Sequence, residues 1–135
     1  MHASDSAPST AARWTGWILT GLVVVFFTID GTLKLLEHEE AMRATQQIGF
    51  PAQVVSGLGL TTLAIVALYL YPRTAVLGAI LMTGLLGGAV AAHLRIGSPL
   101  FTHVLFGVYV GVVAWLALFL RNLRLRDVLL GWRQP

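Results

Sequence analysis

The stretch from residue 75 to residue 121, AVLGAILMTGLLGGAVAAHLRIGSPLFTHVLFGVYVGVVAWLALFLR, holds two long apolar runs joined by a short polar turn. Each run has roughly the 20 residues that an α-helix needs to cross about 30 Å of hydrocarbon. The apolar residues are continuous rather than alternating, which favours helices over a β-barrel. This stretch therefore predicts a pair of transmembrane helices.

The composition of the whole chain also indicates a membrane protein. Of the 135 residues, 56% are hydrophobic and only 11% are charged, whereas a soluble domain carries about 25% charged residues. The chain contains no cysteine, which excludes disulfides, thiolate metal sites and cysteine nucleophiles. The formal net charge is +3, but the surplus Arg lies at the ends of apolar runs. That placement is typical of membrane topology and not of nucleic-acid binding.

Two further apolar runs precede this pair, so the sequence predicts an all-α, four-helix transmembrane bundle over residues 13–120. The sequence YPRT joins the second run to the third, and RIGSP joins the third to the fourth. Connections this short make successive helices antiparallel neighbours, which predicts up-down connectivity. The expected helices cover about residues 14–36, 54–71, 75–94 and 100–120.

The remaining segments are expected to lie outside the hydrocarbon. Residues 1–12 are small and polar, and they predict a disordered tail. Residues 121–135 mix Arg with Leu and Trp, which predicts an interfacial tail. In the longer linker, residues 37–53, we expect a short interfacial helix that is capped by Gly49 and ends before Pro51.

The distribution of Lys and Arg predicts the orientation. Four helices place both termini on one side of the membrane, which holds six basic residues against three on the other. Because basic residues concentrate in cytoplasmic loops, we expect a multi-pass protein of the plasma (inner) membrane with both termini in the cytoplasm. The six are Arg13, Arg73, Arg121, Arg124, Arg126 and Arg133, and the three are Lys34, Arg43 and Arg95.

Five ionisable residues are expected to gather at the end of the bundle away from the termini. The first and third helices end there and the fourth begins there, whichever way the protein inserts. Asp30 and Lys34 are four residues apart and share a helical face, and His93 faces His103 across the tight turn. Charges at membrane depth are costly, so they are usually paired and face inward. This predicted polar cluster comprises Asp30, Lys34, His93, Arg95 and His103.

The residues alone leave the chemistry of the polar cluster open. A structural role is one alternative, with an Asp30–Lys34 ion pair and basic side chains that reach the headgroups. A histidine beside a carboxylate can also move protons near neutral pH, or an imidazole can bond a quinone oxygen. Two histidines and a carboxylate form a known metal-ligand set. Metal and haem are nevertheless disfavoured, because the histidine spacing matches no ligand motif.

Two glycine pairs are spaced for close packing between helices. Gly84 and Gly88 lie four residues apart in the third helix, and Gly107 and Gly111 lie four apart in the fourth. Small residues at this spacing let helix backbones approach one another. We expect both pairs to pack inside the bundle, and a homo-oligomer formed through one pair is the alternative.

Most Trp and Tyr residues are expected near the membrane interfaces, where they form aromatic belts. Tyr109 lies nearer the middle of the fourth helix, and we expect it to face inward because its hydroxyl needs a partner. The residues assigned to the belts are Trp14, Trp17, Tyr69, Tyr71, Trp115 and Trp132.

Several motifs resemble the DoxX-like family of small membrane proteins. They are DGTLKLL at the end of the first helix, IGFP before the second, YPRTAVLGAILMTGLLGGAVAAHLRIGSPLFTH through the third, and RNLRLRDVL after the fourth. The resemblance covers about residues 14–130. The family motif carries over onto all five members of the polar cluster, and no catalytic role comes with it.

The resemblance implies a four-helix membrane protein with a link to redox metabolism, because the family takes its name from small subunits of a thiosulfate:quinone oxidoreductase. We therefore expect a small redox-associated membrane subunit in which His93 and His103 bond a quinone or another apolar molecule. Asp30 and Lys34 would set the local charge, and Arg95 would anchor the cluster. Electron transfer would need a bound quinone, a metal or a redox partner protein.

Two other functions remain open. A non-enzymatic membrane adaptor or assembly factor would use the polar cluster structurally and contact its partner through a glycine stripe. A membrane isomerase or hydrolase would use His and Asp as acid and base. The sequence leaves open whether the protein is an enzyme.

Overall fold

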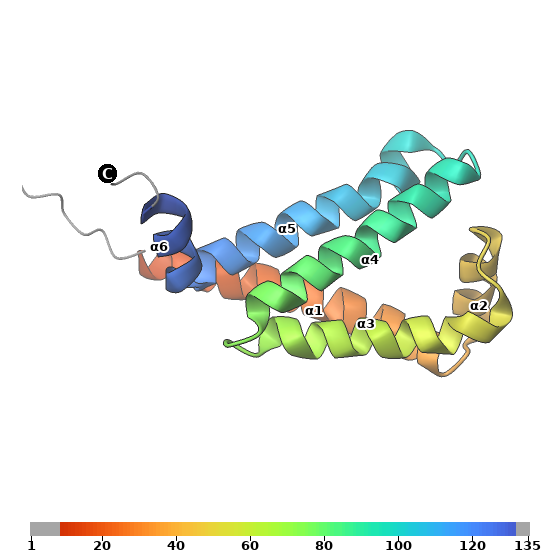
Figure 1. Ribbon diagram of the computed structural model, residues 1–135, viewed down its shortest axis with the longest axis horizontal. Coiled ribbons are helices and arrows are strands. Elements are labelled where there is room, and N and C mark those ends of the chain that lie inside the picture. The colour runs from red at the N-terminus through yellow and green to blue at the C-terminus, as the bar shows by residue number, and fades with distance from the viewer. Residues whose placement is uncertain (1–8, 132–135) are drawn as a thin grey trace, which may run out of the picture.

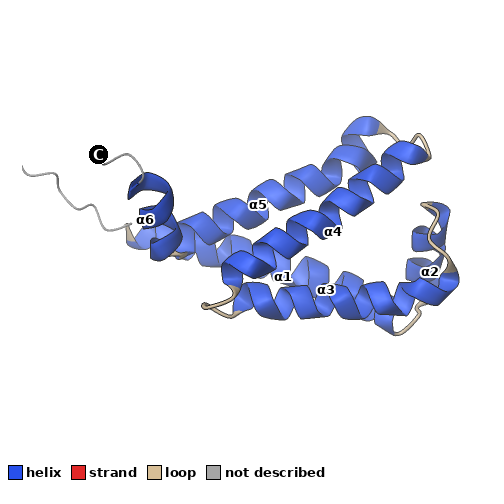
Figure 2. Cartoon of the chain, viewed as in Figure 1, coloured by secondary structure: helices blue, strands red, loops and turns tan. Residues whose placement is uncertain are grey.

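The computed structural model describes residues 9–131, in which four long helices form a bundle (Figure 1). All four helical segments are long and apolar enough to cross a membrane, which confirms the predicted all-α transmembrane fold. Helices account for nearly all of the described chain (Figure 2). The long helices are α1 (Thr10–Leu35), α3 (Val55–Leu70), α4 (Ala75–Arg95) and α5 (Leu105–Arg121), and the short ones are α2 (Glu39–Gln47) and α6 (Leu123–Gly131).

The start of α1 differs from the prediction. The helix begins at Thr10 because the Ser9 hydroxyl accepts a hydrogen bond from the amide of Ala12 at 3.2 Å, which caps the first turn. Residues 10–12, which were expected in the disordered tail, are therefore helical. The rest of that tail, residues 1–8, lies outside the described residues, as do Trp132 and Arg133.

The long helices form two hairpins. Around the bundle, α1 packs against α3 and α5, and α4 packs against the same two helices. The start of α1, the α3–α4 turn, the end of α5 and α6 lie together, and we call this the terminal end. The end of α1, α2, the start of α3 and the α4–α5 turn form the opposite end, the α2 end. Figure 1 shows that α4 and α5 lean away from α3 toward the α2 end, where α2 lies between the two hairpins.

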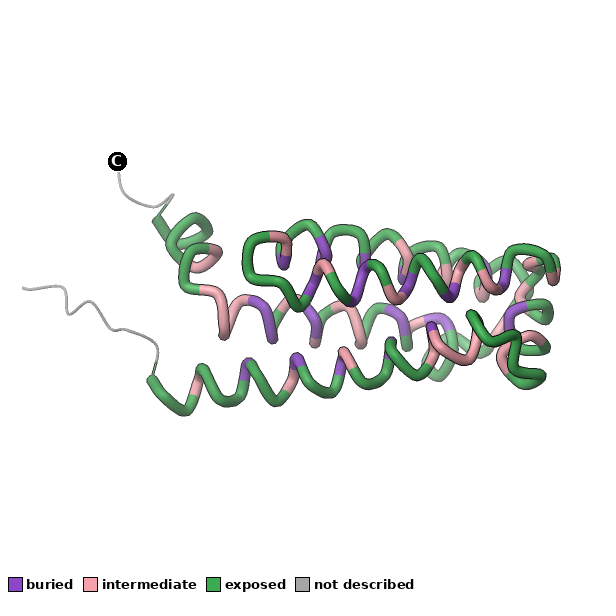
Figure 3. Tube along the Cα trace, turned by 90° about the horizontal axis from the view of Figure 1, so that it is seen from below, coloured by how far each residue is buried: buried purple, intermediate pink, exposed green. Residues whose placement is uncertain are grey.

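The core is narrow, and much of the apolar surface faces outward. Tyr69, Met82 and Leu118 are almost completely buried between the helices. Large apolar side chains such as Leu22 and Val112 are more than 60% exposed. Figure 3 shows buried residues recurring along one side of each long helix, with exposed residues on the other. A bundle that presents Leu and Val outward is suited to hydrocarbon as its solvent.

Two glycines that the sequence analysis did not single out make the closest helix contacts. A Cβ on Gly59 of α3 would meet the α1 backbone, at the Leu35 amide nitrogen and 2.6 Å from the Gly31 carbonyl oxygen. A Cβ on Gly78 of α4 would meet the backbone of Tyr69. Only glycine permits these approaches, so Gly59 and Gly78 set the distance between successive helices.

The four glycines that were predicted to pack divide into two groups. Gly107 lies against α4, where an added Cβ would be 3.0 Å from Val90, and the Gly111 position is 3.5 Å from Leu86. Gly84 and Gly88 have no neighbour within 4 Å of an added Cβ. The prediction that these two pack inside the bundle is therefore wrong, since they lie on an open face of α4.

Two tyrosines also lie differently from the prediction. Tyr69 is completely buried rather than in an aromatic belt, and its hydroxyl donates to the Ala114 carbonyl at 2.7 Å. The Arg121 guanidinium lies between the rings of Tyr69 and Trp17 and donates to the Tyr69 carbonyl at 2.6 Å. Tyr109, which was expected inside, is 49% exposed. The terminal end is thus held by a buried tyrosine and an arginine that joins three helices.

Candidate functional site

A cavity of about 170 Å³ lies at the α2 end, where the two hairpins diverge. It draws residues from α1, α2, α3, α4 and α5, together with the turn that leads into α5. Four of the five members of the predicted polar cluster line it. They are Asp30, Lys34, His93 and His103.

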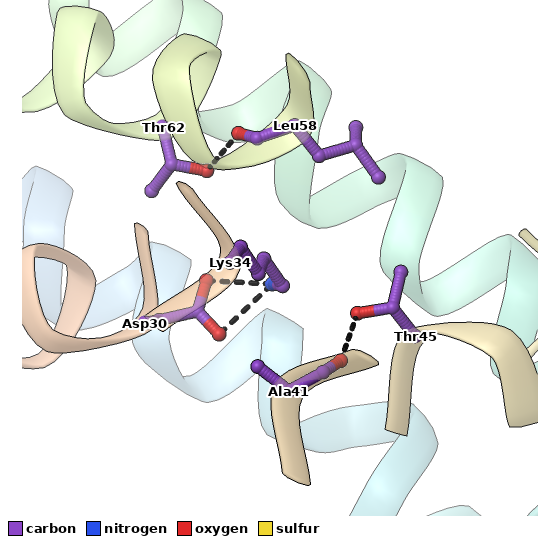
Figure 4. A network of polar contacts seen from close by, with 6 residues as sticks. All are labelled: Asp30, Lys34, Ala41, Thr45, Leu58 and Thr62. Atoms are coloured by element: carbon purple, nitrogen blue, oxygen red, sulfur yellow. Dashed lines mark hydrogen bonds and ion pairs between the residues drawn. The ribbon is translucent and has the colours of Figure 1, made fainter. Parts of the chain in front are cut away.

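The acidic and basic members of the cavity form an ion pair along α1. The Lys34 ammonium lies 2.6 and 2.8 Å from the two Asp30 carboxylate oxygens (Figure 4). The i,i+4 spacing puts both side chains on one helix face, and Asp before Lys is the favourable order. The Lys34 and Asp30 side chains are 22% and 35% exposed, so the pair lies at the cavity wall and is only partly screened.

Two threonines bring further polar atoms to the wall. Thr45 of α2 and Thr62 of α3 are both buried. Their hydroxyls donate to the carbonyls of Ala41 and Leu58 at 2.8 and 2.9 Å (Figure 4). Each hydroxyl proton is already bonded within its own helix. The hydroxyl oxygens can therefore only accept hydrogen bonds from a molecule in the cavity.

The two histidines face each other across the α4–α5 turn, with ring centroids 5.8 Å apart. His93 Nδ1 lies 3.0 Å from the Ser98 hydroxyl, and His103 Nδ1 lies 2.8 Å from the Thr102 hydroxyl. His103 belongs to the π-helical turn Leu100–Val104. Within the described part of the chain, neither Nε2 atom has a hydrogen-bond partner. Both rings therefore line the cavity with one nitrogen available for a ligand.

Arg95 is placed outside the cavity, unlike the other four members of the cluster. Its Nη2 donates to the carbonyl of Ile48 at 3.1 Å, and its guanidinium lies against Gly49. Gly49 adopts a positive φ of 96° after the end of α2. Arg95 thus ties the end of α4 to the C-terminus of α2, where a cation is favoured by the helix dipole. It holds α2 in place and does not touch the space between the histidines.

The rest of the wall is apolar, and it includes phenylalanines that were not predicted to line a site. Phe26 lies four residues before Asp30, and Phe106 lies three residues after His103, so each shares a helix face with a polar cavity residue. That spacing in the sequence could have indicated that Phe26 and Phe106 line the same site as the polar residues. The four phenylalanines that line the cavity are Phe26, Phe27, Phe50 and Phe106.

The donor set does not form a metal site in the described structure. Among residues 9–131, no three His, Asp or Glu side chains lie close enough together to hold a metal ion. The Asp30 carboxylate is bonded to Lys34 through both oxygens.

Comparison with known protein families gave a match over most of the chain. The model of the DoxX-like family matches residues 18–117, from within α1 to within α5. No curated protein and no solved structure matched the chain. The matched span contains all six polar residues that line the cavity.

Proposed function

Because the chain belongs to the DoxX-like family, we propose that it is a small redox-associated membrane subunit that binds a quinone or a similar flat apolar molecule in the cavity. One observation carries this proposal. His93 and His103, whose Nε2 atoms have no hydrogen-bond partner among residues 9–131, line a cavity that also contains the Asp30–Lys34 ion pair and four phenylalanines.

The size of the cavity suits a single ring. An apolar cavity of about 150 Å³ is large enough to hold benzene, and this one measures about 170 Å³. Phenylalanine side chains from α1 and α5 supply flat apolar contacts; the rings of Phe26 and Phe106 lie 5.6 Å apart, edge to face. Such walls favour a planar, weakly polar ligand.

The histidines supply the polar recognition. When the Ser98 and Thr102 hydroxyls donate to the Nδ1 atoms, each imidazole carries its proton on Nε2 and offers a hydrogen-bond donor to a quinone oxygen. Asp30 and Lys34 set the charge at the opposite wall. A bound quinone supplies the redox chemistry, and the electrons would pass to or from a partner protein in the membrane.

The proposal is tested by binding a short-tailed benzoquinone to the full chain in lipid nanodiscs. We expect His93→Gln and His103→Gln each to raise Kd by about tenfold, or roughly 1.4 kcal/mol, because the flexible Gln amide no longer holds its donor at the position of the imidazole Nε2. His38→Gln is the matched control, because His38 is exposed and does not line the cavity. Equilibrium dialysis gives Kd, and thermal unfolding reports on stability.

A different result would favour the adaptor function. If the wild-type protein does not bind the quinone, or if both cavity variants bind it as tightly as His38→Gln does, the quinone site is wrong. A lower unfolding temperature in His93→Gln with no change in Kd would assign the cluster a structural role instead.

We also propose that the protein lies in the plasma membrane with both termini in the cytoplasm. Within the described residues, the terminal end carries five Arg residues, whereas the α2 end carries three basic residues. The cationic excess at the terminal end favours the cytoplasmic side.

Single cysteines test this orientation, because the chain has none of its own. We expect a membrane-impermeant maleimide to label His38→Cys, at the α2 end, in cells with an intact plasma membrane. Tyr71→Cys, in the α3–α4 turn, should react only after lysis. The reverse pattern would place the termini outside.

A further inference from the structure

An apolar groove of about 670 Å³ runs along the outer face of α4 and α5, apart from the polar residues of the α2-end cavity. Its floor includes Gly87 of α4 and Gly111 of α5. At the terminal end of the bundle, Leu125 and Leu129 of α6 border the groove. The groove therefore passes from the level of Val90 and Gly107, which also line the α2-end cavity, to the level at which the headgroups of one leaflet begin.

Missing side chains create the hollow. An added Cβ at Gly87 would meet nothing within 4 Å, and at Gly111 it would meet only Leu86, at 3.5 Å. A Cβ at Gly87 would enter open space, and one at Gly111 would be in ordinary van der Waals contact with Leu86. Neither glycine is needed to let α4 approach α5. Because glycine has no side chain, both positions leave empty space on the outer face of the bundle.

The groove offers no unbonded side-chain donor or acceptor to a polar ligand. Its polar side chains are Thr83 and Trp115, and the Trp115 indole donates to the Thr83 hydroxyl at 2.8 Å. The Thr83 hydroxyl in turn donates to the carbonyl of Ala79 at 2.8 Å. Every other lining residue is Gly, Val, Leu or Phe. An occupant of the groove must therefore be hydrocarbon along this length.

A cation lies beside the groove at its terminal end. The Arg126 guanidinium lies 5.3 Å from the centre of the Phe119 ring, and Phe119 lines the groove. Arg126 is half-buried and forms no ion pair with any carboxylate in the span from residue 9 to residue 131, its neighbour Asp127 included. A hydrocarbon slot with a cation at its interfacial end matches a molecule that has an apolar chain and an anionic head.

We propose that this groove binds an acyl chain of an anionic phospholipid from the leaflet at the terminal end, with Arg126 bound to the headgroup phosphate. The site does not depend on the redox function, because it shares no polar residue with the α2-end cavity. Basic residues at a membrane surface each favour anionic lipid by a factor of about five.

Native mass spectrometry of the full chain, with phosphatidylglycerol and phosphatidylcholine of identical chains, tests the proposal. We expect the wild type to bind phosphatidylglycerol about fivefold more tightly, and Arg126→Gln to remove that preference. Arg73→Gln, which removes a charge at the terminal end away from the groove, should keep it. Gly87→Leu should weaken binding of both lipids, whereas Gly84→Leu should not, since Gly84 is equally open but does not line the groove.

Three results would overturn the proposal. Equal binding of the two lipids by the wild type would contradict the preference for an anionic headgroup. Equal losses in Gly87→Leu and Gly84→Leu would show that the groove is not the binding site. A wild-type dimer that Gly87→Leu dissociates would assign the groove to a second copy of the chain. Circular dichroism verifies folding, and Arg126→Gln, on a peripheral helix, keeps the test decisive if Gly87→Leu does not fold.

Discussion

Replacing Gly59 with Ala is expected to destabilise the protein by about 3 kcal/mol, at the upper end of the cost of overpacking a tight contact. The new Cβ would lie 2.6 Å from the Gly31 carbonyl oxygen and 2.9 Å from the Lys34 carbonyl carbon. These are backbone atoms of α1 and have no rotamer to change, so the two helices must separate. Thermal unfolding in nanodiscs should show a Tm lower by roughly 10 °C.

Gly57→Ala is the matched control for this substitution. Gly57 lies two residues earlier in α3, is exposed, and an added Cβ there would meet nothing within 4 Å. Because Ala favours a helix over Gly by about 1 kcal/mol, this variant should be unchanged or slightly more stable. Equal stability of the two variants would mean that the close approach of α1 and α3 does not contribute to folding.

Replacing Tyr69 with Ala is expected to cost about 4 kcal/mol, as for other large aromatic residues removed from a core. Tyr69 is completely buried, and its ring packs against the Arg121 guanidinium. Tyr69→Phe keeps the ring but removes the hydrogen bond to the Ala114 carbonyl, so it should cost only about 1–2 kcal/mol. Denaturation in mixed micelles measures both losses.

Tyr71→Ala separates this effect from a general requirement for tyrosine at the end of α3. Tyr71 is 54% exposed, and its loss should change the free energy of unfolding by less than about 0.5 kcal/mol. If Tyr69→Ala were no more harmful than Tyr71→Ala, both residues would belong to the aromatic belt that their sequence positions suggest.

The four-helix fold could be predicted because hydrocarbon thickness fixes the length of an apolar run. The meeting of Asp30, Lys34, His93 and His103 could be predicted as well, since helix ends joined by short turns share one end of the bundle. Neither prediction required knowledge of helix rotation. The sequence was a poorer guide to which side chains face lipid and which face the core, because this depends on the rotation of each helix about its axis.

Helix rotation explains the main errors. In an apolar helix, the face toward lipid and the face toward the core contain the same residue types. Spacing alone could not show that Gly84 faces outward while Gly59 touches α1, or that Tyr69 is buried while Tyr109 is exposed. The position of Arg95 depends on a contact with α2, a helix from a distant part of the sequence.

The two hairpins are packed together at the terminal end, so a small change of angle there would move their other ends by a much larger distance. Tyr69, Gly78 and Arg121 form the pivot there, while the cavity lies at the far end of α4, about 30 Å away for 21 residues. Over that arm, a tilt of roughly 7° at the pivot moves the far end by the 3.5–4 Å that separates two packed carbon atoms. If the proposed quinone carries substituents that exceed the 170 Å³ of the cavity, a slight rotation around the buried tyrosine would supply the additional space.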